Sequence, residues 1–176
     1  MAHLSREQVM ARLKGIRLLA LDVDGVLTDD SIFFGPDGFE MKKFNISDGF
    51  FIVLAMRAGL EIAIVSGRPS PATITRMKDL GVKHVLQAMK SKVAQIKPLL
   101  DELELDFDEI AFVGNELLDI KLARKAALGV AVADSAPEMI EAADFVTSKK
   151  GGEGAVRELL QLWFESVGKN PQDLIV

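Results

Sequence analysis

The chain has 176 residues, 49% of which are hydrophobic, and its formal net charge is −5. This length suits one domain with a sizeable core, and the acidic balance argues against nucleic-acid binding, which needs a clustered basic face. Cysteine is absent, which excludes disulfides and cysteine zinc sites. Apolar runs stay shorter than the roughly 18 residues of a membrane-spanning helix, and the first residues lack the apolar region of a secretory signal. We therefore expect a cytoplasmic protein without a membrane partner.

Short apolar runs alternate with helical patterns along the chain. An amphipathic helix is expected at 4–13, where apolar residues recur at helical spacing. The expected strands lie at 16–23, 60–67, 82–87, 109–114, 129–134 and 144–147. Several of these runs are almost continuously apolar, which is typical of parallel strands buried on both faces. The alternation predicts an α/β fold, with a Rossmann-like parallel sheet flanked by helices in a single domain spanning 1–176.

Local signals mark where the helices between these strands begin and end. The expected helices cover 47–59, 70–81, 91–105, 116–129 and 154–168. Ser47 and Asp48 are a good cap pair for the first of them, and Pro71 suits the first position of the second. Pro98 falls in the middle of the third, where we expect a kink or break. The polar tail from 168 to 176 is expected to be frayed and flexible.

One segment, 29–46, does not fit this alternation. Its Gly35-Pro36-Asp37-Gly38 sequence is a turn signal between two runs with strand character. We predict a β-hairpin inserted directly after the first strand. Phenylalanines at 33, 34 and 39 would be an apolar liability on an exposed hairpin of a monomer, so an interface is expected there. Lys42 and Lys43 are expected to lie on the exposed surface of the hairpin.

Polar and charged residues follow the strands at the ends where open α/β sheets bind their ligands. They are Asp22, Asp24, Ser66, Arg68, Lys90, Ser91, Lys92, Asn115, Glu116 and Asp119. A single such residue is explained equally well by a turn or a helix cap. Their occurrence after several different strands indicates a common site.

The residue types at this edge suit phosphoryl transfer. Asp22 and Asp24 are two positions apart, so they point to the same side of an extended chain. One can act as a nucleophile while the other protonates the leaving group. Converging carboxylates need a cation, and oxygen ligands without His or Cys favour Mg²⁺. Ser66 can donate to a phosphate oxygen and Lys92 can neutralise its charge.

Four stretches, "LDVDGVLTD", "VSGR", the lysine of "SKV" and "VGNELLD", resemble the motifs of the haloacid dehalogenase superfamily phosphatases. "FNISDG", "IVSGRPS", "GVAVADSAPE" and "GGEGAVRELL" are similar to an essentially capless branch, the 3-deoxy-D-manno-octulosonate 8-phosphate phosphatases. The resemblance covers about 16–160. It implies a Mg²⁺-dependent phosphatase that hydrolyses a sugar-acid phosphate through an aspartyl-phosphate intermediate.

The resemblance also implies a role for each matching residue. Asp22 would be the nucleophile, Asp24 the general acid and base, and Ser66 and Lys92 would hold the phosphoryl group. The implied metal site comprises Asp22, the backbone carbonyl of Asp24, Asn115, Glu116 and Asp119, with Asp119 orienting the others. The substrate would meet Asn45, Ile46, Ser47, Asp48, Gly49, Arg68, Arg76 and Arg157.

The branch implies a homotetramer in which the hairpins pack together. In such an assembly the segment Gly151–Arg157 can reach a neighbouring active site.

Three departures from the family pattern leave alternatives open. Asn115-Glu116 stands where Asp-Asp is usual, which weakens the attraction for a metal. Ser47 and Val53 stand where many relatives have basic residues, which bears on recognition of an acidic sugar. The alternatives are a nonulosonate 9-phosphate phosphatase and a catalytically weak tetrameric scaffold. The intact motif residues argue against the scaffold.

Overall fold

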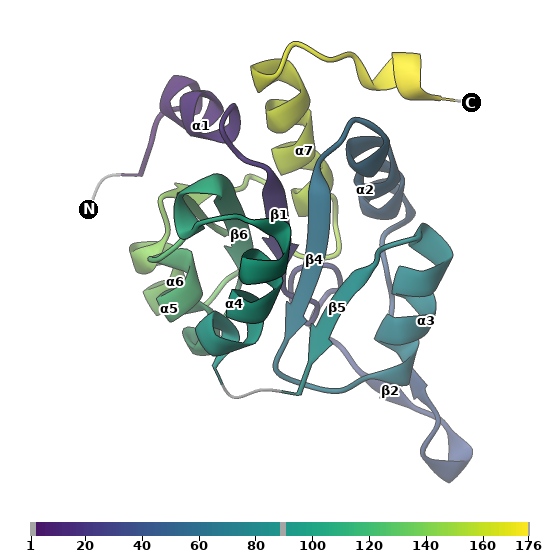
Figure 1. Ribbon diagram of the computed structural model, residues 1–176. Coiled ribbons are helices and arrows are strands. Elements are labelled where there is room, and N and C mark those ends of the chain that lie inside the picture. Colours follow the sequence, from purple (N-terminus) through teal and green to yellow (C-terminus); the bar gives the residue numbers. More distant parts are fainter. Residues whose placement is uncertain (1–2, 89–90, 176) are drawn as a thin grey trace.

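The computed structural model describes residues 3–88 and 91–175. Its centre is a six-stranded parallel sheet in the order β5-β4-β1-β6-β7-β8, with helices on both faces (Figure 1). The strands are β1 (Leu18–Leu21), β4 (Glu61–Ser66), β5 (His84–Gln87), β6 (Ile110–Gly114), β7 (Leu128–Ala131) and β8 (Phe145–Val146). All of the expected strands are present, and the predicted α/β fold is confirmed.

The helices cover the sheet in two layers. They are α1 (Arg6–Leu13), α2 (Ile46–Arg57), α3 (Pro71–Leu80), α4 (Lys92–Leu103), α5 (Ile120–Ala123), α6 (Pro137–Ala142) and α7 (Ala155–Ser166). Side chains of α1, α2, α3 and α7 form one core with Leu19 and Leu21 of β1. Side chains of α4, α5 and α6 form the other with Leu18 and Ala20. Burial on both faces explains why β1 is continuously apolar. None of the helices in 3–88 and 91–175 is long and apolar enough to cross a membrane.

The segment after β1 forms the expected hairpin, with β2 (Phe33–Phe34) antiparallel to β3 (Glu40–Met41) around the short helix η1 (Pro36–Gly38). It projects beside α3 at the carboxyl end of the sheet (Figure 1). Phe34 and Phe39 are 66% and 65% exposed, as the sequence predicts. Lys43 is exposed too, and pairs with Asp29 at 3.0 Å.

Lys42 differs from the prediction, because its side chain has no exposed surface. The hairpin lies against the core domain at this point, and Lys42 points inward to Asp24.

Several helix ends also differ from the prediction. The cap of α2 is Asn45 rather than Ser47-Asp48, because the Asn45 side chain accepts from the backbone N–H groups of Ser47 and Asp48 at 2.8 and 3.2 Å. Helix α4 runs through Pro98 without a break. Pro98 and Ala94, whose carbonyl loses its intrahelical partner, are both exposed, so water can satisfy that carbonyl.

Two segments near the C-terminal half are organised differently from the expectation. The long helix expected at 116–129 is a short η3 (Leu117–Asp119) followed by α5. The tail, expected to be frayed, forms η4 (Pro171–Leu174), and Leu174 packs against the core beside α2. The carbonyl of Leu174 accepts from Arg57 at 2.9 Å. These contacts place η4 against α2.

Candidate active site

The carboxyl ends of β1, β4 and β6 open into one cavity of about 460 Å³. Its lining residues are Asp22, Asp24, Asp30, Ser66, Gly67, Arg68, Lys92, Asn115, Glu116, Leu118 and Asp119. Each residue predicted to be catalytic or to hold the metal is among them. Lys90 lies outside the described residues. Asp30 and Leu118 were not expected at the site.

Two buried carboxylates share one ammonium group at the floor of the cavity. The Lys92 Nζ, at the start of α4, lies 2.8 Å from Asp22 Oδ2 and 2.5 Å from Asp119 Oδ1. One negative charge therefore remains uncompensated in a region that water barely reaches. Burial, and then the neighbouring Asp119 carboxylate, raise the pKa of Asp22 to about 7 against the opposing effect of Lys92.

Two sets of contacts shape the turn after β6: hydrogen bonds to Asp119, and packing of Gly25 from the loop after β1. Asp119 Oδ2 accepts from the backbone N–H groups of Asn115 and Glu116 at 2.8 and 3.1 Å. Gly25, at φ +76°, packs against the Asn115 amide, and a Cβ there would lie 1.9 Å from Asn115 Nδ2. Only glycine fits this contact. The Asn115 side chain thereby lines the same cavity as the Asp22 carboxylate.

The donor set of this site fits a divalent cation. The Asn115 Oδ1 is buried and has no hydrogen-bond partner among the described residues, although buried polar atoms are normally paired. It lies in the cavity that carries the uncompensated charge. Oxygen donors of this kind suit a hard cation such as Mg²⁺. No cluster of three or more His, Cys, Asp or Glu side chains that could hold a metal occurs in the described part of the chain. Here one of the candidate donors is the Asn115 amide oxygen.

Glu116 is placed differently from the other residues predicted to surround a metal. Its side chain accepts from the backbone N–H of Leu117 at 3.1 Å and so caps η3. The residue is exposed at the rim of the cavity.

Ser66 is the last residue of β4, and Arg68 lies on the loop that follows it. The Ser66 hydroxyl is buried, accepts from the backbone N–H of Arg68 at 3.3 Å and donates to the Arg68 carbonyl at 3.1 Å. The Arg68 guanidinium pairs through Nη2 with Glu40 of the hairpin. Its Nη1 is buried without a partner among the described residues. Arg68 thus lines the cavity with a guanidinium group that is only partly paired by the described residues.

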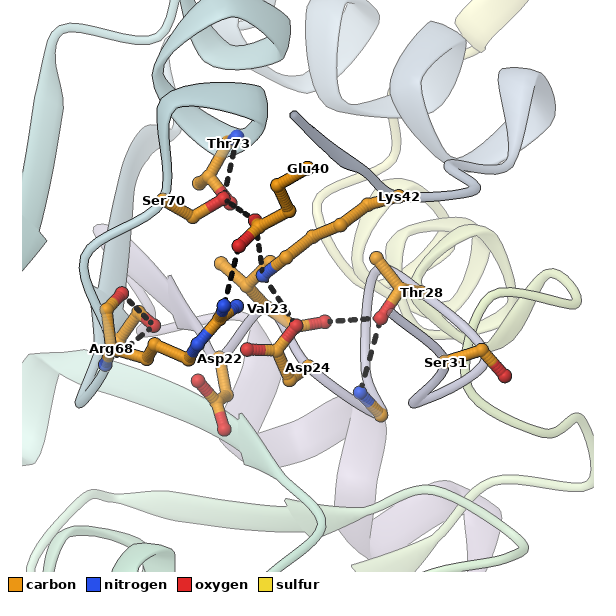
Figure 2. A network of polar contacts seen from close by, with 12 residues as sticks. Asp22, Val23, Asp24, Thr28, Ser31, Glu40, Lys42, Arg68, Ser70 and Thr73 are labelled. Carbon is orange, nitrogen blue, oxygen red and sulfur yellow. Dashed lines mark hydrogen bonds and ion pairs between the residues drawn. The ribbon is translucent and has the colours of Figure 1, made fainter. Parts of the chain in front are cut away.

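The hairpin contributes polar groups that sequence reasoning missed. Figure 2 shows Lys42 lying between Asp24 and Glu40, and Glu40 in contact with Arg68 and Ser70. Glu40 and Lys42 are two positions apart, so they project from the same side of an extended strand. This spacing is the sequence feature that indicates a shared position for the two side chains.

Comparison with known proteins places the chain in a family. A family model described as haloacid dehalogenase-like hydrolase matches residues 84–159. The 3-deoxy-D-manno-octulosonate 8-phosphate phosphatase of Escherichia coli strain K12 is 42% identical over 161 residues, which cover 92% of this chain and 86% of the relative. The chain belongs to the haloacid dehalogenase-like hydrolases. It is a phosphoric monoester hydrolase, as the sequence motifs imply.

Solved structures of similar phosphatases contain divalent cations. The Moraxella catarrhalis 3-deoxy-D-manno-octulosonate 8-phosphate phosphatase, solved with magnesium, phosphate and KDO, has a TM-score of 0.89 and 32% identity, with 92% of this chain and 93% of that chain covered. The cobalt-bound Haemophilus influenzae phosphatase has a TM-score of 0.85 and 31% identity, covering 89% and 92%. A divalent cation therefore belongs to the chemistry of this family, in agreement with the donor set described above.

In this hydrolase, the predicted substrate residues at the start of α2 contact α7 instead of lining the cavity. Asp48 is 1% exposed and accepts from the backbone N–H groups of Gly154 and Arg157 at 3.3 and 2.7 Å, so it caps α7. Burial is the main cause that raises its pKa. Ser47 Oγ lies 2.6 Å from Arg157 Nη1. The side chains of Ser47, Asp48 and Arg157 do not line the cavity.

The remaining predicted substrate residues also lie away from the cavity. Asn45 caps α2 and donates to the Gly152 carbonyl at 3.1 Å, and Ile46 is 81% exposed. Gly49 packs against Arg76, which lines a separate groove of about 750 Å³ between the hairpin and α3. Arg68 is the one predicted substrate residue that the structure brings to the cavity.

The glycine-rich segment Gly151–Arg157, expected to reach a neighbouring active site, begins against its own chain. The backbone of Gly151 and Gly152 packs on Gly25 and Thr28, where a Cβ at either glycine would clash. The start of the segment therefore packs against the loop that follows β1.

Proposed function

We propose that this phosphatase hydrolyses a sugar-acid phosphate, 3-deoxy-D-manno-octulosonate 8-phosphate. The observation that carries the proposal is Arg68, whose side chain lines the cavity with Asp22 and Lys92 and whose Nη1 has no partner among the described residues. A carboxylate on the substrate is a natural acceptor for a guanidinium N–H of this kind. The identity to an octulosonate phosphatase over most of the chain supports the same substrate.

The proposed reaction proceeds in two steps through an aspartyl-phosphate. A carboxylate oxygen of Asp22 attacks phosphorus, the bond from phosphorus to the sugar oxygen breaks, and Asp24 gives its proton to that oxygen. Water then attacks the phosphorus of the aspartyl-phosphate and passes a proton to Asp24. This releases inorganic phosphate and regenerates the Asp22 carboxylate. Lys92 and Ser66 hold the phosphoryl oxygens throughout.

Asp22, the backbone carbonyl of Asp24 and Asn115 would hold Mg²⁺, with Glu116 and Asp119 around them. The cation would neutralise charge on the phosphoryl group and on Asp22. Asn115 is uncharged where relatives usually have a carboxylate, so a weaker affinity for the cation is expected than with an acid at this position.

We also expect a homotetramer built through the hairpins. Phe33, Phe34 and Phe39 form an apolar surface that is 52 to 66% exposed in the single chain. A surface of this kind is an interface more often than a monomer feature. The described residues form no cap domain over the catalytic cavity, and a neighbour's hairpin can close it.

The proposal is tested by measuring phosphate release from a panel of substrates, with and without Mg²⁺. The panel contains the octulosonate 8-phosphate, a nonulosonate 9-phosphate and a neutral sugar phosphate. The highest kcat/KM is expected for the octulosonate ester, in the presence of Mg²⁺. A preference for the nonulosonate ester by more than about tenfold, or about 1.4 kcal/mol, replaces this substrate with the alternative. Failure to hydrolyse any of the esters points to the scaffold.

A further inference from the structure

Lys42 is buried although it belongs to an exposed hairpin. Its side chain has no exposed surface, whereas the side chain of the adjacent Lys43 is 62% exposed. An ammonium group removed from water is costly unless it is paired with opposite charge. Its Nζ lies 2.5 Å from Asp24 Oδ1 and 4.0 Å from Glu40 Oε1. Lys42 is therefore directed to the catalytic edge of the sheet and away from solvent.

The hairpin arm that carries Lys42, directly after β3, is fixed to the core domain by Glu40. The Glu40 side chain is 9% exposed and accepts from Ser70 Oγ at 2.5 Å and from Arg68 Nη2. Ser70 also caps α3 by accepting from the backbone N–H of Thr73 at 3.2 Å. Figure 2 shows this chain of contacts leading from α3 through Glu40 and Lys42 to Asp24. Lys42 thus approaches Asp24 from a hairpin arm that is itself held in place.

The Asp24 side chain is held at one oxygen only. Lys42 donates the one hydrogen bond that this carboxylate receives from the described residues, and the bond goes to Oδ1. The side chain is 24% exposed and lines the cavity. The other carboxylate oxygen receives no hydrogen bond from the described residues and so remains available.

We infer that Lys42 is a positioning residue, which holds the Asp24 carboxyl group in place to exchange a proton with the leaving-group oxygen. The inference rests on the proposed function, in which Asp24 protonates that oxygen as its bond to phosphorus breaks. Lys42 touches neither the phosphoryl group nor the sugar and acts through Asp24. A side chain with one tethered oxygen keeps its second oxygen in a narrower range of positions.

This role has a kinetic signature that a purely structural role lacks. An aliphatic alkoxide is a poor leaving group and depends on protonation as the ester bond breaks, whereas a nitrophenolate leaves without it. The probe is a series of substituted phenyl phosphates of graded leaving-group acidity, together with an alkyl phosphate. The quantity measured is kcat/KM, which reports the formation of the aspartyl-phosphate.

In Lys42→Met, we expect kcat/KM for the alkyl phosphate to fall by about 10- to 100-fold, within the range for proton-transfer catalysis. For p-nitrophenyl phosphate, the fall should stay below about threefold. Asp24→Asn should show the same steepened dependence on leaving-group acidity. When Lys42→Met is added to Asp24→Asn, kcat/KM for the alkyl phosphate should fall by less than a further factor of about two, because the two residues act as one unit.

Two matched variants separate positioning from anchoring of the hairpin. Lys43→Met removes the exposed neighbour that pairs with Asp29 and should leave the whole series unchanged. Glu40→Gln loosens the hairpin but keeps Lys42. It should lower kcat/KM for all substrates by a similar factor. The inference is overturned if Lys42→Met also lowers kcat/KM for every substrate by a similar factor, or changes kcat/KM for none of them. It is also overturned if Lys42→Met is additive with Asp24→Asn.

The results that would contradict the proposed function differ from those that would contradict the role of Lys42. If the parent protein hydrolyses the phenyl series but not the octulosonate ester, the substrate is wrong while the role of Lys42 is still decided by the series. If the parent hydrolyses no phosphate ester, the phosphatase chemistry itself is wrong.

Discussion

Replacing Asp22 with asparagine should stabilise the metal-free protein while it abolishes turnover. An amide cannot form the aspartyl-phosphate. It also removes the uncompensated charge, since Lys92 and Asp119 then remain as a neutral pair. Burial raises the pKa of Asp22 from 3.8 to about 7. At about 1.4 kcal/mol per pH unit, ionising this group costs on the order of 4 kcal/mol, and relaxation of the site reduces that to about 2–4 kcal/mol.

The pH dependence of this effect has a definite sign. Because the pKa of Asp22 is raised in the folded state, its contribution to stability is fully present below about pH 4 and is lost as pH rises through about 7. The advantage of Asp22→Asn should therefore be small at pH 4 and complete at pH 8. For a chain of this size, it corresponds to roughly 5–15 °C in Tm.

The assay is thermal unfolding in EDTA from pH 4 to pH 9, with Asp108→Asn as the control because Asp108 is an exposed carboxylate. Adding Mg²⁺ should raise the Tm of the parent protein and have much less effect on Asp22→Asn, because one proposed ligand is lost. A variant that is less stable than the parent in EDTA at pH 8 would refute the reasoning. An advantage that does not change with pH would refute it equally.

Asp48→Ala should lower stability by about 2–3 kcal/mol, since it leaves two backbone N–H groups of α7 without their charged acceptor; urea unfolding measures this, and Asp48→Asn should lose less. Asn115→Asp should lower the Mg²⁺ concentration for half-maximal activity, because a carboxylate attracts the cation more strongly than an amide; a metal titration with no change, or a rise, would remove the idea. Light scattering at micromolar concentration should report a tetramer, and Phe34→Glu should dissociate it by placing charge in the interface. A monomeric parent protein would contradict the hairpin interface.

Several features of this protein depend on residues close together in the sequence, and these could be predicted from it. The run Leu18–Leu21 is apolar at every position because both faces of β1 are buried. Ser70, Pro71 and Gly81 mark the two ends of α3 through the conformations that each residue favours. The aspartates proposed to be catalytic, Asp22 and Asp24, follow β1, and parallel strands bring their carboxyl ends to one edge. The cavity could therefore be anticipated from the polar residues at the ends of the predicted strands.

Other features depend on which distant segments meet, and only the tertiary structure decided them. Asp48 has the pattern of a local helix cap, but it caps α7, more than a hundred positions later in the chain. Lys42 has the pattern of a surface charge, but the hairpin folds against the core domain and buries it beside Asp24. The polar tail contacts the core because Leu174 packs against apolar side chains beside α2. In each case, the residue's environment comes from a partner far away in sequence, and local propensity carries no information about that partner.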